Sequence, residues 1–115
     1  MTVTIYHNPS CSKSRQTLEI IKKKGIKPII IEYLKVIPTK DKIKRILTML
    51  DYEPRDLMRK KESVYTEFNL EDSSLSDDVL INFMVKNPIL IERPIIICNN
   101  KIAIGRPPEK VLGIL

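Results

Sequence analysis

The chain has 115 residues, which is enough for one ordinary domain with its own core and too few for two. Lysine and arginine outnumber aspartate and glutamate by 20 to 14, and the resulting formal charge of +6 favours acidic partners or small anions. Aromatic residues make up only 5% of the chain and no nucleic-acid motif occurs, which argues against a nucleic-acid partner. No apolar run reaches membrane-spanning length, so no membrane partner is expected.

The first half of the chain predicts a strand, a helix and a second strand. Residues 3–6 form a short apolar run, and residues 12–24 carry Ser14, Leu18 and Ile21 on one helical face. Gly25 is a typical helix stop. Residues 29–34 begin with three isoleucines, which predicts a strand covered on both faces. This βαβ unit implies parallel strands joined by a right-handed crossover.

The middle of the chain is predicted to be helical. Thr39 caps one amphipathic helix, and Ser76 caps another that ends before Pro88. Between them we expect a helical segment at residues 55–61 and a short helix at 63–69. Residues 94–98 and 101–105 then predict a β-hairpin around a two-residue turn, and a last helix follows the prolines at 107 and 108.

This order of elements predicts an α/β fold. A βαβ unit, a helical insert and a ββα unit around a mixed central sheet, with a cysteine after the first strand, form the ground plan of the thioredoxin fold. We expect residues 1–115 to form a single thioredoxin-like domain, with the helical insert at about 39–88.

Cys11 is the candidate nucleophile because it stands where the first helix begins. Unpaired backbone N–H groups and the positive end of the helix dipole favour a thiolate there. The alternative is a small buried cysteine in a tight loop. Cys98 lies in a predicted buried strand, and we expect a structural role for it. Two distant cysteines and no apolar leader favour a cytoplasmic protein without disulfides.

Several separated motifs resemble the glutaredoxin-dependent arsenate reductase family, in its short bacterial branch. The resemblance covers nearly the whole chain and is carried by His7-Asn8-Pro9-Ser10-Cys11, Leu57-Met58-Arg59-Lys60-Lys61, Glu92-Arg93-Pro94-Ile95 and Gly105-Arg106-Pro107-Pro108-Glu109. It implies an oxidoreductase that works in arsenic detoxification and reduces arsenate to arsenite. Arsenate needs several rigid donors, which guanidinium groups provide.

The resemblance also implies roles for individual residues. Cys11 would attack arsenic, with His7 lowering the pKa of the thiol and Ser14 donating toward the thiolate. The expected oxyanion ligands are Arg59, Arg93 and Arg106. Asn8 and Arg15 are also expected to bind the substrate, and their side-chain hydrogen bonds would orient the loop. Pro94 resembles the cis-proline that faces the cysteine in thioredoxin-like proteins.

The cysteine loop has no second thiol, because serine occupies position 14. Outside thiols must therefore complete the reaction, and the resemblance implies glutathione as co-substrate and glutaredoxin as partner. His7 is the only histidine, and no metal-ligand spacing is evident, so we expect neither a metal nor a bound cofactor. We expect the protein to be a monomer.

Two other classes of function remain open. A glutaredoxin-like thiol oxidoreductase would share the fold and Cys11, but would leave the three arginines with little to do. A non-enzymatic regulator resembling the Spx transcription factors, which bind RNA polymerase, would explain the basic surface. Redox-sensing members of that group usually carry a Cys-x-x-Cys switch, which is absent here.

Overall fold

The computed structural model describes residues 1–115, which form two compact units. One unit joins Met1–Val36 to Arg93–Leu115, and the other is Ile37–Glu92. The second unit corresponds to the helical insert, which the sequence placed at about 39–88. None of the helices combines the length and the apolar character that crossing a bilayer requires.

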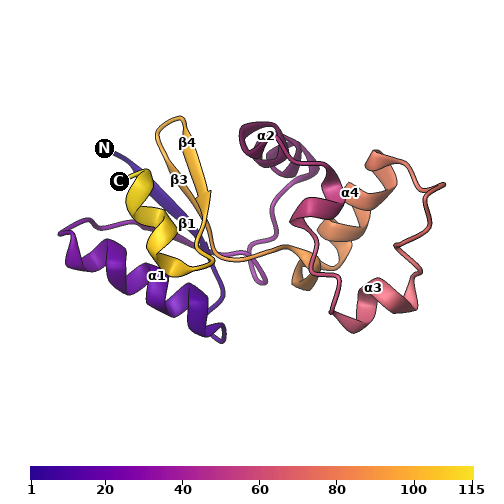
Figure 1. Cartoon of the computed structure of the whole chain (residues 1–115), viewed down its shortest axis with the longest axis horizontal. Helices are drawn as coiled ribbons and strands as arrows, with labels where there is room; N and C mark the ends of the chain where they lie inside the picture. The colour runs from indigo at the N-terminus through magenta and orange to yellow at the C-terminus, as the bar shows by residue number, and fades with distance from the viewer. The chain divides into compact units, whose positions relative to one another are not determined.

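The first unit is a four-stranded mixed sheet with helices on one face (Figure 1). Its elements in chain order are β1 (Val3–His7), α1 (Ser12–Lys23), β2 (Ile29–Glu32), β3 (Ile95–Cys98), β4 (Lys101–Ile104) and the 3-10 helix η3 (Pro108–Gly113). The strand order is β2-β1-β3-β4, where β1 pairs with β2 in parallel and the other pairs are antiparallel. The predicted α/β, thioredoxin-like order is confirmed.

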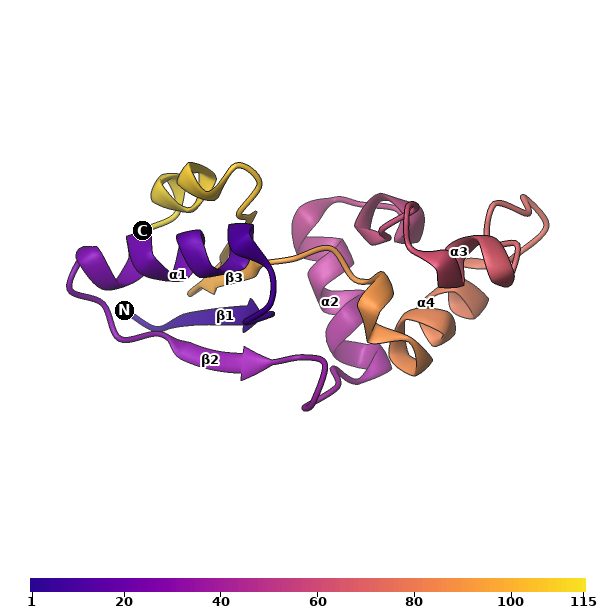
Figure 2. The ribbon, with the colours of Figure 1, turned by 90° about the horizontal axis from the view of Figure 1, so that it is seen from below.

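The core of this unit lies between the sheet and the two helices α1 and η3. Figure 2 shows both helices on the same side of the strands. Alternate residues of the central strands meet one residue from each helix, in a buried cluster of Val3, Ile5, Ile21, Ile96, Cys98 and Val111. Because side chains alternate across a strand, this register fixes which residues of β1 face the helices.

The predicted burial of β2 on both faces is wrong. Ile29 and Ile30 are 54% and 45% exposed, and the strand ends at Glu32 rather than at residue 34. The reason is the position of β2 at the edge of the sheet, where it pairs only with β1. An apolar run favours a strand, but the strand order decides how much of it is covered.

The second unit is helical. It contains α2 (Lys40–Leu50), the 3-10 helix η1 (Pro54–Leu57), α3 (Ser63–Glu67), α4 (Asp77–Lys86) and the 3-10 helix η2 (Pro88–Leu90). Both predicted caps are confirmed, because the hydroxyls of Thr39 and Ser76 accept from the backbone amides of Lys42 and Val79, each at 3.2 Å.

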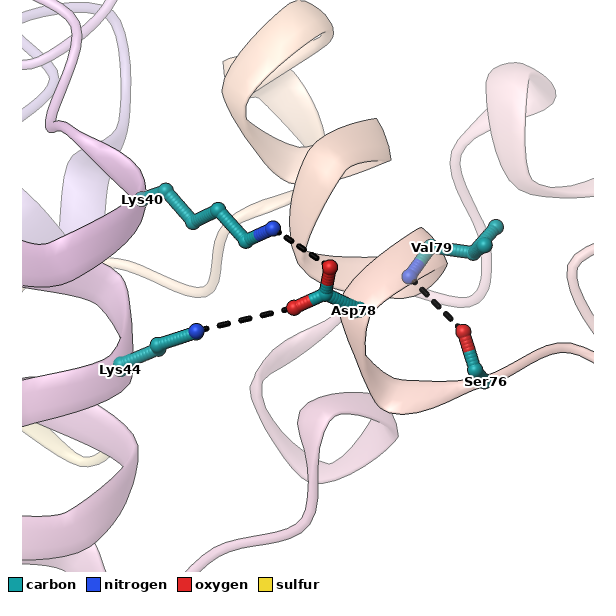
Figure 3. Close-up of polar contacts among 5 residues, drawn as sticks. All are labelled: Lys40, Lys44, Ser76, Asp78 and Val79. Atoms are coloured by element: carbon teal, nitrogen blue, oxygen red, sulfur yellow. Dashed lines mark hydrogen bonds and ion pairs between the residues drawn. The ribbon is translucent and has the colours of Figure 1, made fainter.

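Figure 3 shows how α2 and α4 are linked at the surface. The Asp78 carboxylate lies 2.6 Å from Lys40 Nζ and 3.6 Å from Lys44 Nζ. Asp78 also stands in the first turn of α4, where a negative charge favours the helix dipole. These side chains are partly to largely solvent-exposed, so the ion pairs contribute little to stability.

The predicted helical segment at 55–61 is too long. The helix η1 ends at Leu57, and Met58 pairs with Ile91 in an isolated antiparallel β-bridge. Arg59 N–H donates to the Leu90 carbonyl at 2.7 Å, and Glu92 N–H donates to the Leu57 carbonyl at 2.8 Å. These bonds to a distant segment replace the helical ones, and Met58 lies on extended backbone.

Candidate functional site

Cys11 lies where the loop after β1 becomes α1. It is the N-cap of α1, in extended backbone conformation, and its side chain is half-buried. Asn8 shapes this loop, because its carbonyl accepts from Cys11 N–H at 3.0 Å and its side chain accepts from Ser10 N–H at 3.0 Å. Arg15 Nη1 donates to the Pro9 carbonyl at 2.9 Å, so its guanidinium also ties down the loop.

Two arginines reach the sulfur of Cys11 from the other half of the sheet. Arg93 precedes β3 and Arg106 follows β4, and the pairing of Ile95 with Ile104 brings them to the same end of the hairpin. Arg106 Nη1 lies 3.8 Å from Cys11 Sγ and donates to the Arg93 carbonyl at 3.1 Å. The hairpin therefore brings together at Cys11 two of the three arginines that the sequence singled out.

The surroundings of Cys11 favour its thiolate. Burial raises the pKa of the thiol, but the Ser14 backbone amide, the Arg93 and Arg106 side chains and the Lys13 amide together hold the pKa below its ordinary value. The two amides face the sulfur without the geometry of a formed cap hydrogen bond. A larger share of Cys11 is therefore thiolate at neutral pH than for an ordinary cysteine.

Both arginines are followed by a proline in cis. The Arg93–Pro94 and Arg106–Pro107 peptide bonds are both cis. The cis bond before Pro94 was predicted from the sequence, and the one before Pro107 was not.

His7 and Ser14 form a buried polar pair beneath the loop. His7 Nδ1 lies 2.6 Å from Ser14 Oγ, which also accepts from Asn8 N–H at 3.1 Å. Burial lowers the pKa of His7, with Lys22 and Arg15 adding to the effect and Glu32 opposing it, so the ring is neutral at pH 7. The Ser14 hydroxyl thus engages His7 and Asn8, while its amide is the group that faces Cys11.

The remaining predicted residue, Arg59, belongs to the helical unit. Its Nη1 lies 2.8 Å from Glu92 Oε1, and its Nε is buried without a hydrogen-bond partner. Glu92 had no predicted role, although it stands beside Arg93 in one of the quoted motifs. The position of Glu92 next to Arg93 was a signal in the sequence that this carboxylate pairs with one of the arginines, and its partner is Arg59.

No three His, Cys, Asp or Glu side chains gather in a way that could hold a metal ion. Cys11 and Cys98 are both free thiols, and Cys98 is buried in the core of the sheet unit. The site therefore offers one accessible thiol and positively charged donors.

The chain is similar to known proteins over almost its whole length. The ArsC family model matches residues 6–114. The uncharacterized protein YfgD of Escherichia coli K12 is 50% identical over 114 residues, covering 98% of this chain and 96% of YfgD. The arsenate reductase of the same organism is 43% identical over 113 residues, and the match covers 98% of this chain and 80% of the length of that enzyme.

A solved structure agrees with these relatives. The structure of the arsenate reductase from Vibrio cholerae has a TM-score of 0.97 and 52% sequence identity, and the match covers 100% of this chain and 98% of that one. The sequence and the fold thus lead to the same group of proteins.

Proposed function

The chain belongs to the ArsC family, and from this premise we propose that it is an arsenate reductase, which reduces arsenate to arsenite. The observation that carries the proposal is the approach of Arg106 Nη1 to within 3.8 Å of Cys11 Sγ, with the Arg93 side chain beside the same sulfur. A nucleophile and two planar cations around one point fit a tetrahedral oxyanion whose central atom is attacked.

We propose that Arg93 and Arg106 bind the oxygens of arsenate and offset the charge that develops on them. Arg59 is the third proposed ligand. The proposal for Arg59 rests on membership of the ArsC family, because this arginine belongs to the helical unit. Asn8 and Arg15 contribute by holding the loop that carries Cys11.

The proposed first step forms one bond and breaks one. The Cys11 thiolate attacks arsenic, a sulfur–arsenic bond forms, and one arsenic–oxygen bond breaks as hydroxide leaves. Arsenic stays in the +5 state, because the displacement transfers no electrons. His7 and Ser14 support this step by organising the loop and the Ser14 amide that faces the sulfur.

The second step needs a thiol from another molecule. Cys98 is buried in the core and position 14 is serine, so Cys11 has no partner within its own loop for a disulfide. We propose that glutathione attacks the Cys11 sulfur, that arsenite leaves with the sulfur–arsenic electron pair, and that a Cys11–glutathione disulfide remains. Glutaredoxin then reduces this disulfide with its own thiols. No bound cofactor takes part in this scheme. We propose that the protein works as a monomer in the reducing cytoplasm, where free thiols persist.

The two alternatives are weaker on specific grounds. A glutaredoxin-like oxidoreductase has no need of two guanidinium groups at the sulfur, and an Spx-like regulator has no need of a thiol with a lowered pKa facing them. Neither alternative is favoured by a separate observation.

The test measures arsenite directly after incubating the protein with arsenate. The complete mixture contains glutathione and glutaredoxin, and two further mixtures each omit one of them. We expect arsenite only in the complete mixture, or far more of it there. Equal arsenite without either thiol donor would overturn the proposed second step. Binding to the C-terminal domain of the polymerase α-subunit with no arsenite formed would favour the regulator.

A further inference from the structure

A tight junction lies just behind the candidate site, where α1 meets the hairpin. Thr17 is fully buried, and its hydroxyl donates to the Lys13 carbonyl at 2.8 Å and lies 3.5 Å from the Gly105 carbonyl. Gly105 N–H in turn donates to the Pro94 carbonyl at 3.0 Å. Three segments that are distant in sequence thus meet at Gly105.

Gly105 leaves no room for a side chain. A Cβ built there would clash with Thr17 Oγ1, and would lie 2.8 Å from Pro94 Cγ and 3.0 Å from Thr17 Cγ2. Real Cβ atoms essentially never come within 3.0 Å of such neighbours, so with any larger residue these side chains or the segments that carry them must shift. The glycine is required here by close approach and not by its backbone angles.

Each residue of the junction is tied to one group at the sulfur. Gly105 directly precedes Arg106, Pro94 directly follows Arg93, and Thr17 lies on the helix whose first residue follows Cys11. The junction therefore lies between the backbone segments that carry Arg106 and Cys11.

We propose that Gly105 and Thr17 are positioning residues, which hold Arg106 and Arg93 against Cys11 by letting α1 and the hairpin approach without a side chain between them. The expected effect on arsenate binding rests on the proposed function, whereas the expected effect on the reactivity of Cys11 does not. A junction that serves only stability would leave the chemistry of Cys11 unchanged, which separates the two roles.

The test compares Gly105→Ala with Gly113→Ala, whose added Cβ meets nothing within 4 Å. The main measurement is the rate of iodoacetamide alkylation of Cys11 across pH, followed on the Cys11 peptide by mass spectrometry. We expect the Gly105→Ala profile to move to higher pH, because the arginines retreat from the thiolate. The KM for arsenate should rise about tenfold, the effect of losing one charge-assisted hydrogen bond. Gly113→Ala should match the wild type in both.

Two further variants keep the test decisive. Thr17→Ala removes two of the three clashing atoms, so Gly105→Ala/Thr17→Ala should recover part of the wild-type alkylation profile, a non-additive result. If Gly105→Ala does not fold, Thr17→Val, which keeps the shape and loses the hydroxyl, should shift the profile in the same direction by less.

The proposal is overturned if folded Gly105→Ala alkylates with the wild-type profile, or if Gly105→Ala fails to fold and Thr17→Val also keeps that profile. Alkylation requires no arsenate. A wild-type protein that does not reduce arsenate would therefore refute the proposed function, while the alkylation profiles would still decide the positioning role.

Discussion

His7 Nδ1 and Ser14 Oγ lie 2.6 Å apart in the buried layer beneath the Cys11 loop. The same oxygen accepts from Asn8 N–H at 3.1 Å, so one hydroxyl joins the end of β1, the loop and the first turn of α1. This contact connects the only histidine to the helix turn whose amides face the nucleophile.

Replacing Ser14 with alanine should therefore affect both stability and reactivity. The buried Asn8 amide and His7 ring lose their partner, which should lower the free energy of unfolding by about 2 kcal/mol. Cys11 should also be alkylated more slowly at pH 7, because the turn that carries the Ser14 amide loosens. Urea unfolding and alkylation rates measure the two effects. Ser12→Ala, an exposed position in the same turn, is the matched control, and an equal loss in that variant would contradict the role of Ser14.

The lowered pKa of His7 predicts a loss of stability in acid. The unfolded state takes up a proton near pH 6.5, whereas the buried folded-state ring resists protonation. The free energy of unfolding should therefore fall as pH drops from 6.5 toward the lowered pKa, and level off below it. Urea unfolding at a series of pH values measures this slope. His7→Gln should flatten it, and an unchanged slope would assign the acid sensitivity to other groups.

Arg59→Ala should weaken arsenate binding if its guanidinium is the third oxyanion ligand, as proposed. We expect the KM for arsenate to rise about tenfold or more, and Arg59→Lys to restore little of it, since one ammonium cannot reproduce the guanidinium fork. Steady-state assays measure KM, with Arg45→Ala, an exposed arginine on α2, as the control. A wild-type KM in Arg59→Ala would leave the ion pair with Glu92 as a purely structural contact.

Cys98→Ala should spare the chemistry and weaken the fold. Cys98 is 3% exposed and packs in the core of the sheet unit, so its loss should cost about 1 kcal/mol of unfolding free energy. Most of the arsenate turnover should remain. Complete loss of turnover in a variant that thermal unfolding shows to be folded would instead make Cys98 part of the reaction.

Local signals in the sequence predicted much of the fold. Caps at Thr39 and Ser76 and the stop at Gly25, which has a φ of 76°, depend on nearby residues only. The strand-to-helix transition at Cys11 is local in the same sense. That residues 1–115 form one domain stays a prediction, as do the roles of the individual site residues.

Errors arose where distant segments decide the structure. The exposure of Ile29 follows from strand order, and the extended backbone at Met58 follows from its bridge to Ile91. Thr17 resembles an ordinary polar helix residue, yet it is fully buried because Gly105 allows close approach. Only the register of the hairpin brings two arginines to one sulfur.

We propose that Cys11 reduces arsenate together with thiols from other molecules. The most direct measurement is arsenate-dependent oxidation of NADPH in the presence of glutathione, glutathione reductase and glutaredoxin, comparing the wild type with Cys11→Ser. We predict oxidation with the wild type and none above background with Cys11→Ser. No signal with the wild type, or the same signal with both proteins, would contradict the claim.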